Sequence, residues 1–327
     1  MVTAAAPPAP VLSAAMSLTV VGSVAFDAVE TPFDKRERML GGAATHFALA
    51  ASFFDDVHVV GVVGDDFTAE DEGVLTAHGV DVTDIEHVEG GKTFFWSGRY
   101  HDNMNSRDTL DTQLNVFETF EPKLSEASKA AQTVFLANIQ PSLQLQVLEQ
   151  CTEATFTALD SMDLWINIAK DDLLAVLSKV DCVILNDEEI ELLTGKPTIV
   201  SAAQALLELG PSVIVAKQGK YGAGVITKEG SFWLPAYPLH EVNDPTGAGD
   251  TFAGGFVGYI AAHPERPITL EVLRRAMAYG SAIASYNVEE FGTDRVSRLT
   301  GPEVVARVQD LAKITQFDDA SQIDLRR

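Results

Sequence analysis

Short apolar segments alternate with longer mixed segments along most of the chain. The apolar segments have the length and β-branched composition of buried strands, and they lie at 18–27, 57–66, 133–139, 155–161, 181–187 and 212–219. Segments with a helical spacing of apolar residues lie at 41–54, 67–79, 248–263 and 270–288. This alternation predicts an α/β fold with a doubly wound, mostly parallel sheet flanked by helices. Ligands of such sheets bind beyond the carboxyl ends of the strands.

The region from about 84 to 120 has a different pattern. Aromatic and β-branched residues alternate with polar ones in "TFFWSGRYHD" (93–102) and in "TQLNVFETFE" (112–121). The polar stretch "NMNSRDTLD" (103–111) separates these two segments. We therefore expect a small antiparallel β lid inserted into the main domain, with its aromatic residues packed on one face of the sheet.

One domain is expected from residue 18 to residue 312. Residues 1–17 are rich in Ala and Pro and contain no Lys or Arg, because the first basic residue is Lys35. They lack the basic region of a signal peptide and are expected to form a flexible tail. Residues 313–327 are expected to form a C-terminal tail. Charged, Gly or Pro residues interrupt every apolar run before it is long enough to cross a bilayer.

The charge of the chain excludes several classes of partner. Asp and Glu number 47 against 23 Lys and Arg, which gives a net charge of −24. Such a chain repels phosphate backbones and anionic membranes, so neither nucleic acid nor a membrane is expected to bind. The two cysteines, Cys151 and Cys182, match no metal-binding spacing and form no disulfide framework. The reducing cytoplasm is the expected location.

A glycine-rich turn carries the strongest chemical pattern. In "EVNDPTGAGDTFAGG" (241–255), Gly247, Ala248 and Gly249 have almost no side chain, so their backbone N–H groups can approach an anion at a helix start. Asp250 follows directly, where a carboxylate can accept the proton of a hydroxyl that attacks a phosphoryl group. The simpler alternative is a helix cap after an Asp-Pro turn.

Two common nucleotide-binding motifs are excluded. A P-loop ending in "GGKT" (90–93) would need glycine where the chain has Glu86. A dinucleotide fingerprint starting at Gly247 would need glycine where the chain has Phe252. A Rossmann dehydrogenase is therefore not favoured, although the alternation of strands and helices permits one.

The string "DPTGAGDTFAGG" (244–255) resembles the C-terminal signature of the ribokinase-like (PfkB) family of carbohydrate and nucleoside kinases. The resemblance extends from Leu18 to about Thr300, and "GGAATHFALAAS" (41–52) is similar to the N-terminal signature. It implies a ribokinase-like fold and transfer of the γ-phosphoryl group of ATP to a hydroxymethyl group of a sugar or nucleoside. In this resemblance Asp250 is the catalytic base, and Gly247, Ala248 and Gly249 form the anion hole.

The resemblance also implies an acceptor site. Asp27 ends "VVGSVAFD", at the position from which the family binds sugar hydroxyls, and Gly41 and Gly42 let the acceptor approach the backbone. His46 stands where the family commonly has Asn and is either an acceptor ligand or a core histidine on a helix flank. Arg99 of the lid is the nearby basic candidate. In relatives this lid covers the acceptor and often forms a dimer contact, so a homodimer through the lid is expected.

Two departures bear on the acceptor. Ala25, like His46, replaces an Asn that ribokinases often use, so plain ribose is not favoured. Without a cluster of Arg and Lys near Asp27, phosphorylated sugars are not expected to be acceptors.

The nucleotide side is implied by two further motifs. "NDEEIELLTG" (186–195) matches the family motif N-x-x-E through Asn186 and Glu189, which in relatives organise water around Mg²⁺ and the phosphates. "VIVAKQGKYGAGV" (213–225) is similar to the strand and glycine turn near the triphosphate, with Lys217, Gly219 and Gly222 as its notable residues.

Asp244 and Thr246 match positions that border a monovalent cation in many relatives. The expected ligands are therefore ATP, Mg²⁺ and K⁺, together with a small sugar or nucleoside. An alternative of another class is a sugar- or nucleotide-binding sensor that keeps the fold without the chemistry. The sequence does not choose among sugars, sugar acids and nucleosides.

Overall fold

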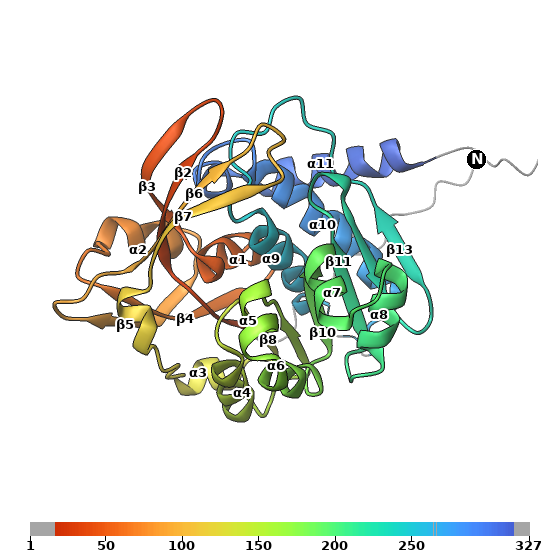
Figure 1. Cartoon of the computed structure of the whole chain (residues 1–327), viewed down its shortest axis with the longest axis horizontal. Coiled ribbons are helices and arrows are strands. Elements are labelled where there is room, and N and C mark those ends of the chain that lie inside the picture. The colour runs from red at the N-terminus through yellow and green to blue at the C-terminus, as the bar shows by residue number, and fades with distance from the viewer. Residues whose placement is uncertain (1–16, 264, 266, 317–327) are drawn as a thin grey trace, which may run out of the picture.

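A nine-stranded sheet forms the centre of the molecule (Figure 1). The computed structural model describes residues 17–263, 265 and 267–316. The strands of this sheet are β1 (Ser17–Val21), β4 (Asp56–Gly64), β5 (Asp81–Val88), β8 (Thr133–Leu136), β9 (Phe156–Leu159), β10 (Cys182–Asn186), β11 (Val213–Lys217), β12 (Ala223–Ile226) and β13 (Ser231–Leu234). They lie in the order β13-β12-β11-β10-β9-β8-β1-β4-β5. All strands from β11 to β5 pair in parallel, and β12 and β13 add an antiparallel edge. The predicted doubly wound, mostly parallel sheet is confirmed.

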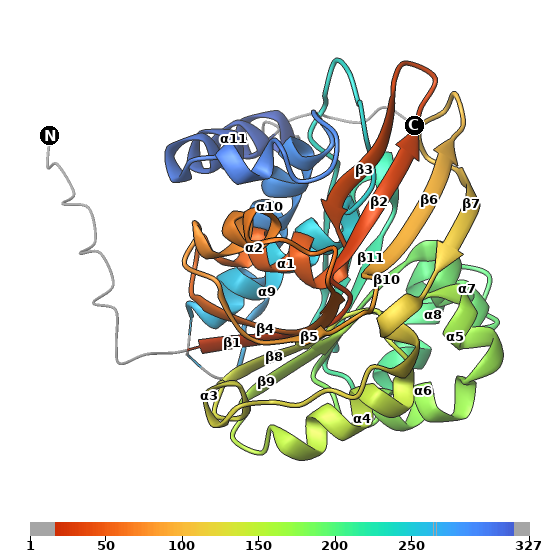
Figure 2. The same cartoon turned by 90° about the vertical axis from the view of Figure 1, so that its left-hand side faces the viewer.

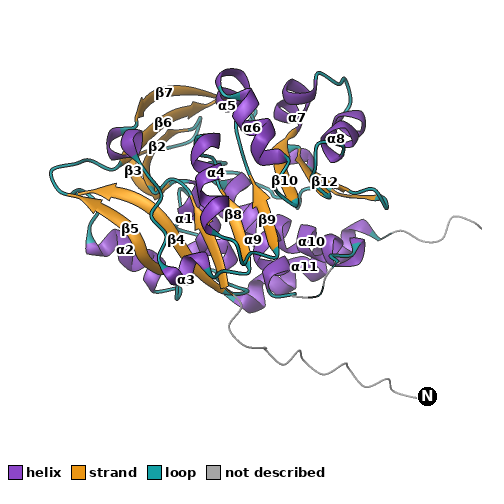
Figure 3. Ribbon diagram, turned by 90° about the horizontal axis from the view of Figure 1, so that it is seen from below, coloured by secondary structure: helices purple, strands orange, loops and turns teal. Residues whose placement is uncertain are grey.

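Helices cover both faces of this sheet (Figures 2 and 3). One face carries α1 (Ala43–Ala51), α2 (Ala69–Thr76), α9 (Ala248–Ala261), α10 (Leu270–Asn287) and α11 (Gly301–Thr315). The other carries α3 (Glu126–Lys129), α4 (Pro141–Gln150), α5 (Asp163–Ile168), α6 (Lys170–Leu177), α7 (Asp187–Thr194) and α8 (Ile199–Leu207). The neighbours Phe135 and Leu136 of β8 enter opposite cores, because successive side chains of a strand point to opposite faces.

Small residues let α9 lie unusually close to its neighbours. A Cβ at Gly254 would lie 2.2 Å from the carbonyl oxygen of Phe47 in α1, and one at Gly255 would lie 2.9 Å from Cα of Gly280 in α10. A larger side chain at either position would push the helices apart. The glycines inside this helix therefore serve packing, and they hold its N-terminus at a fixed place over the sheet.

A second, smaller sheet forms the lid. Its strands are β2 (Ala25–Glu30), β3 (Lys35–Gly41), β6 (Phe94–Tyr100) and β7 (Arg107–Gln113), in the order β3-β2-β6-β7. It stands upright beside the main sheet (Figure 2). The predicted lid is present and is larger than expected, because β2 and β3 belong to it. Both outer pairings are antiparallel, whereas β2 and β6 pair in parallel.

Two predicted strands are corrected by the structure. The segment 18–27 is two strands in two different sheets, because the chain leaves the main sheet after Val21 and enters the lid at Ala25. The second strand of the hairpin is Arg107–Gln113 rather than 112–121. Every residue of this edge strand is exposed, so it shows no alternation of apolar and polar residues. Residues 115–119 form a short 3-10 helix instead.

The chain termini partly match expectation. The helix α11 continues to Thr315, so the first residues of the expected C-terminal tail are helical. Residues 1–16 and 317–327 of the two expected tails lie outside the described residues. Among the described residues, no helix is both long and apolar enough to span a membrane.

The strand order reverses at β1. The chain passes from β1 to β4 and β5 on one side of it and returns to β8 on the other. Gly22, just after β1, lies close to Ala137, just after β8, because a Cβ added at Gly22 would be 2.7 Å from Cβ of Ala137. Such a switch point opens a crevice at the carboxyl ends of the strands, where α/β proteins place ligands.

We expect the fold to be more stable in salt. A net charge of −24 makes the compact chain repel itself, and the surface ion pairs that salt also screens contribute little. Raising KCl from about 20 mM to about 500 mM should therefore raise Tm by about 2–5 °C in differential scanning calorimetry. Tetramethylammonium chloride should also raise Tm, because screening requires no specific cation. A Tm that falls with either salt would contradict this prediction.

Candidate functional site

Residues from several elements surround the N-terminus of α9. Lys217, at the end of β11, lies beside Gly249, since a Cβ added at Gly249 would be 3.3 Å from Nζ of Lys217. His46 of α1 packs against Gly247, and the hydroxyl of Thr246 donates to Tyr100 of the lid at 3.2 Å. Residues predicted from distant parts of the sequence thus come together at the crevice.

Asp244 fixes the turn before α9. Its Oδ1 accepts a hydrogen bond from the backbone N–H of Thr246 at 2.9 Å, and its Oδ2 accepts one from Gly292 at 3.0 Å. Gly247 then adopts a left-handed conformation (φ 72°), which glycine tolerates best, and serves as the N-cap of α9. The backbone N–H groups at the start of this helix have no partner within it. Residues 247–250 are not fully buried, so this turn is a candidate cradle for an anion.

Asp250 lies in the first turn of α9, beside this cradle. Burial, followed by the negative charge of Asp160, raises its pKa from 3.8 to about 6, while Lys217 and Arg107 oppose the rise. A carboxyl group with a pKa near neutrality is well matched to accepting and releasing a proton. Strongly shifted groups of this kind are typical of functional sites.

Lys217 pairs with Asp160, which the sequence analysis missed. Its Nζ donates to Oδ2 of Asp160 at 3.0 Å, and the two side chains are 16% and 7% exposed. Burial acts to lower the pKa of Lys217, but Asp160, Glu189 and Asp250 together raise it above its usual value. A buried ammonium group is thus held charged beside the cradle. The position of Asp160 at the carboxyl end of the predicted strand 155–161 was the available signal.

Asn186 and Glu189 form a capping box at the start of α7. The backbone N–H of Glu189 donates to Oδ1 of Asn186, and the backbone N–H of Asn186 donates to Oε2 of Glu189, each at 2.8 Å. Burial, followed by Asp160, raises the pKa of Glu189 to about 7, against the attraction of Lys217. The motif therefore caps a helix, and it also places a carboxyl group near the Lys217–Asp160 pair.

Asp27 lies at the lid side of the crevice. It is 7% exposed, and a Cβ at Gly41 would be 2.0 Å from its Oδ2, so only glycine leaves room for this carboxylate. Gly42 (φ 93°) donates its backbone N–H to Asp27. Burial, followed by the charges of Asp244 and Asp250, raises the pKa of Asp27 to about 7. Three of the five expected acceptor residues, Asp27, Gly41 and Gly42, thus lie together. The carboxyl group of Asp27 is close enough to Asp250 for their charges to interact.

His46 has the buried position of a core histidine, the second of its two expected roles. Its ring is 2% exposed and lies against Gly247, where a Cβ would be 2.3 Å from Nε2. Its Nδ1 lies 3.2 Å from Oδ1 of Asn287, whose Nδ2 donates to the carbonyl of Thr246 at 2.8 Å. Burial lowers the pKa of His46 to about 4, so the ring is neutral. His46 supports the turn from below.

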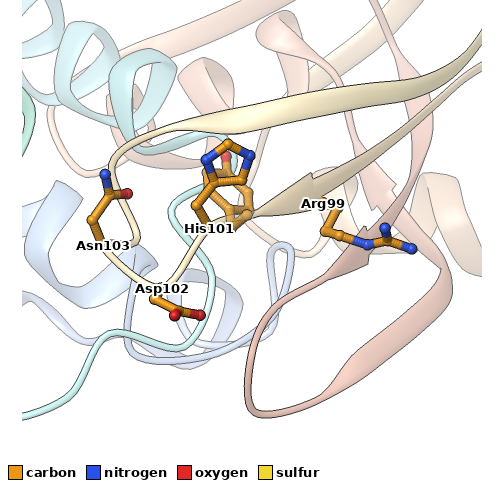
Figure 4. A pocket seen from close by; sticks show the side chains of 5 residues that line it. Arg99, His101, Asp102 and Asn103 are labelled. Atoms are coloured by element: carbon orange, nitrogen blue, oxygen red, sulfur yellow. The ribbon is translucent and has the colours of Figure 1, made fainter.

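The expectation for Arg99 is corrected. Its guanidinium forms two hydrogen bonds with Glu30, at 2.8 and 3.1 Å, on the exposed surface. In the lid sheet Arg99 pairs with Glu30, three residues from Asp27, so its side chain points to the opposite face. Figure 4 shows Arg99 pointing away from His101, Asp102 and Asn103, with which it lines a pocket at the tip of the hairpin. Arg99 does not reach the acceptor side.

Arg107 of β7 is the basic residue of the lid that faces the crevice. It pairs with Tyr100 across the hairpin, and its Cζ lies 5.6 Å from the ring centroid of Trp96. Its charge counteracts the raised pKa of both Asp27 and Asp250. Trp96 is the register partner of Asp27 and therefore shares its face of the sheet. The sequence analysis missed Arg107 because it assigned residues 103–111 to a connection.

Gly219 and Gly222, the remaining glycines expected on the nucleotide side, follow the end of β11. Gly219 and Gly222 bound a short turn after β11, with φ values of 53° and 104°. A Cβ at Gly222 would lie 2.1 Å from the carbonyl oxygen of Leu234 in β13, so a side chain there would displace the edge strand. The turn follows Lys217 directly and extends the crevice away from Asp27.

Comparisons with known proteins identify the family of this chain. The profile of the pfkB family carbohydrate kinase matches residues 15–298. A cytidine kinase from Thermococcus kodakarensis is 32% identical over 260 residues, which are 76% of this chain and 90% of the relative. A nucleoside kinase from Methanothermobacter thermautotrophicus is 26% identical over 322 residues, covering 88% of this chain and 94% of the relative.

A solved structure of nucleoside kinase from Burkholderia thailandensis in complex with inosine has the same fold. It has a TM-score of 0.75 at 18% identity, with 90% of this chain and 97% of that one covered. The predicted ribokinase-like fold is therefore confirmed.

We expect Asp27→Asn to stabilise the fold in a pH-dependent way. Its folded-state pKa of about 7 lies above that of an unfolded carboxyl, so folded wild-type protein binds the proton more tightly. Wild type therefore loses more stability than the variant as the pH rises from about 4 to about 7, because the other raised carboxyl groups are present in both. At pH 8 the variant should melt about 2–6 °C higher.

The control is Asp102→Asn, which removes the same charge from an exposed position and should change Tm little at any pH. If Asp27→Asn is no more stable at pH 8 than this control, the buried carboxylate does not carry the assigned cost.

Proposed function

This chain belongs to the pfkB family of carbohydrate kinases, and from that premise we propose that it transfers the γ-phosphoryl group of ATP to a hydroxymethyl group of a nucleoside or sugar, with Asp250 as the base. The observation that carries the proposal is the position of Asp250. It combines a raised pKa with a place in the first turn of α9, beside a glycine cradle and a buried lysine.

Asp250 takes the proton of the acceptor hydroxyl as that oxygen bonds to the γ-phosphorus. The bond from phosphorus to the bridging oxygen breaks at the same time, and ADP leaves with that oxygen. General bases of this kind contribute about 10²–10⁴-fold to a rate. The neighbouring Lys217 keeps part of the Asp250 population ionised near neutral pH.

The backbone N–H groups of Gly247, Ala248 and Gly249 form the proposed anion hole. The N–H of Ala248 also donates to the carbonyl of Pro245 at 3.2 Å, so an anion would share this donor. These N–H groups point from a helix N-terminus, which carries a partial positive charge, and the left-handed turn at Gly247 holds them in place before reaction. Lys217 adds a full positive charge beside Gly249. Together they stabilise the negative charge that develops on the equatorial oxygens.

The site fits a Mg²⁺-nucleotide. No group of three or more His, Cys, Asp or Glu in the described part of the chain could hold a metal by itself. Mg²⁺ bound with ATP needs few protein ligands, because it keeps water molecules and takes phosphate oxygens. Asn186 and Glu189 would hold such waters, and Gly219 and Gly222 would lie along the phosphates. When bound, the metal neutralises phosphate charge.

A monovalent cation completes the proposal. Both oxygens of Asp244 already accept backbone hydrogen bonds, and a carboxylate has lone pairs left for a hard cation. Thr246 contributes oxygen atoms to the same turn. K⁺ beside the turn would stabilise the cradle from behind.

A nucleoside is the favoured acceptor. Asp27 offers a carboxylate for two adjacent ribose hydroxyls, as expected from the sequence, and Trp96 on the same face of the lid offers a ring for a base. The two relatives reported above are named cytidine kinase and nucleoside kinase. Arg107 provides one positive charge near Asp27, which is not the cluster that a phosphorylated sugar requires.

Two further points belong to the proposal. A sensor without chemistry would bind both ligands and release no ADP, and the shifted pKa of Asp250 favours the enzyme. A homodimer through the lid is supported by the exposed edge strand β7 and by Phe33 and Leu110, which are 71% and 50% exposed.

We expect Asp250→Asn to lower kcat by about two to four orders of magnitude while nucleotide still binds. In wild type, kcat/KM should rise with pH and level off above about pH 8, because Asp250 and Asp27 act as carboxylates with pKa values of about 6 and 7. Steady-state rates with coupled ADP detection measure both. Wild-type turnover by the variant would exclude Asp250 as the base.

The acceptor is tested with pentoses, hexoses, sugar acids, nucleosides and their monophosphates. We expect nucleosides to give the highest kcat/KM, and Trp96→Leu to raise the nucleoside KM about 10-fold or more, because base stacking on an aromatic ring is worth about 1–3 kcal/mol. Phe94→Leu is the matched control, since Phe94 stacks on Phe117 instead. Preferential turnover of a phosphosugar would refute this assignment.

A further inference from the structure

The tip of the hairpin between β6 and β7 reaches across the crevice to the turn after β11. A Cβ at Gly219 would lie 2.4 Å from Oδ1 of Asn105, so the amide of Asn105 rests on the main chain of Gly219. Asn105 belongs to the lid and Gly219 to the nucleotide side of the main domain. The lid therefore contacts the glycine turn directly.

The tip is held in shape by its own hydrogen bonds. Oδ1 of Asn103 accepts bonds from the backbone N–H of Asn105 at 2.9 Å and of Ser106 at 3.0 Å. His101 pairs with Asp108 across the base of the tip at 2.9 Å. These contacts fix the backbone of Asn105, and none of them uses its side-chain amide.

The same hairpin also contacts the acceptor side. Tyr100 accepts the hydroxyl hydrogen of Thr246 from the turn before α9. Met104 packs in a small apolar cluster with Tyr100 and Phe291. One rigid hairpin thus spans from the acceptor side to the nucleotide side.

We propose that Asn105 is a positioning residue that links nucleotide binding to closure of the lid. Its amide carries two N–H donors, and phosphate oxygens arriving at Gly219 supply acceptors within its reach. A bound nucleotide then holds the hairpin down over the acceptor, so each ligand strengthens binding of the other. A closed lid also excludes water from the reaction. This inference rests on the proposed function, because it requires ATP at the glycine turn.

Hydrogen exchange tests the link without an acceptor. Amides of residues 100–108 are followed by mass spectrometry with and without the Mg²⁺ complex of a non-hydrolysable ATP analogue, whose binding is measured separately by calorimetry. In wild type the analogue should slow exchange of the hairpin about 5-fold or more, since a coupling of 5–150-fold is typical. In Asn105→Ala the slowing should be less than about 2-fold at saturating analogue.

The matched control is Asp102→Ala at the same tip, which should respond like wild type. The coupling is overturned if Asn105→Ala shows wild-type protection, or if the analogue binds wild type without protecting the hairpin. If the analogue does not bind wild type at all, the proposed function fails together with this inference. Phosphoryl transfer with an unprotected hairpin would overturn the inference alone.

Discussion

The structure depends on holding several carboxyl groups at a partly buried edge of the main sheet. Asp27, Asp160, Glu189, Asp244 and Asp250 all lie around the N-terminus of α9, and burial raises the pKa of most of them. This negative charge is offset by Lys217, by the positive end of α9 and by the backbone N–H groups that donate hydrogen bonds to Asp244. Shifted carboxyl groups cost stability, and they give the site its capacity to move a proton.

Close helix packing makes this arrangement possible. The glycines of α9 bring that helix against α1 and α10, so the turn at Gly247 is supported from below by His46 and Asn287. The same contacts fix the direction of the helix axis and of the amides at its start. Preorganised amides of this kind need not rearrange during a reaction, which is the basis of electrostatic stabilisation.

Much of the main domain could be predicted from the sequence. Buried parallel strands are continuous apolar runs, so β4, β8, β9, β10 and β11 were visible at 57–66, 133–139, 155–161, 181–187 and 212–219. The glycine turn was visible because small residues, an acidic residue and an apolar helix follow one another directly. The strand β7 was not, because both of its faces are exposed and hydrophobic alternation vanishes in such a strand.

The parts of the site that could not be predicted depend on contacts between distant residues. Asp160 and Lys217 are separated by 57 positions and meet only because β9 and β11 both end at the crevice. Arg107 shares the face of Asp27 because the hairpin pairs it with Tyr100. Arg99 lies three residues after Trp96, the register partner of Asp27, and therefore points to the opposite face. His46 lies within a family motif, but its place in that motif did not determine which residue its side chain contacts.

The turn at Gly247 and the hairpin of the lid are separate parts of the chain, and this separation bears on how the protein can evolve. The cradle is built from main-chain atoms, so it tolerates exchange of most surrounding side chains as long as Gly247 keeps its left-handed conformation. The residues that would distinguish one acceptor from another, Trp96 and Arg107, lie on a separate hairpin. Substitutions at Trp96 can change substrate range while the main-chain cradle stays in place, whereas Arg107 also acts on the pKa of Asp250. A lineage carrying this scaffold can therefore acquire new acceptors by drift in a single surface hairpin.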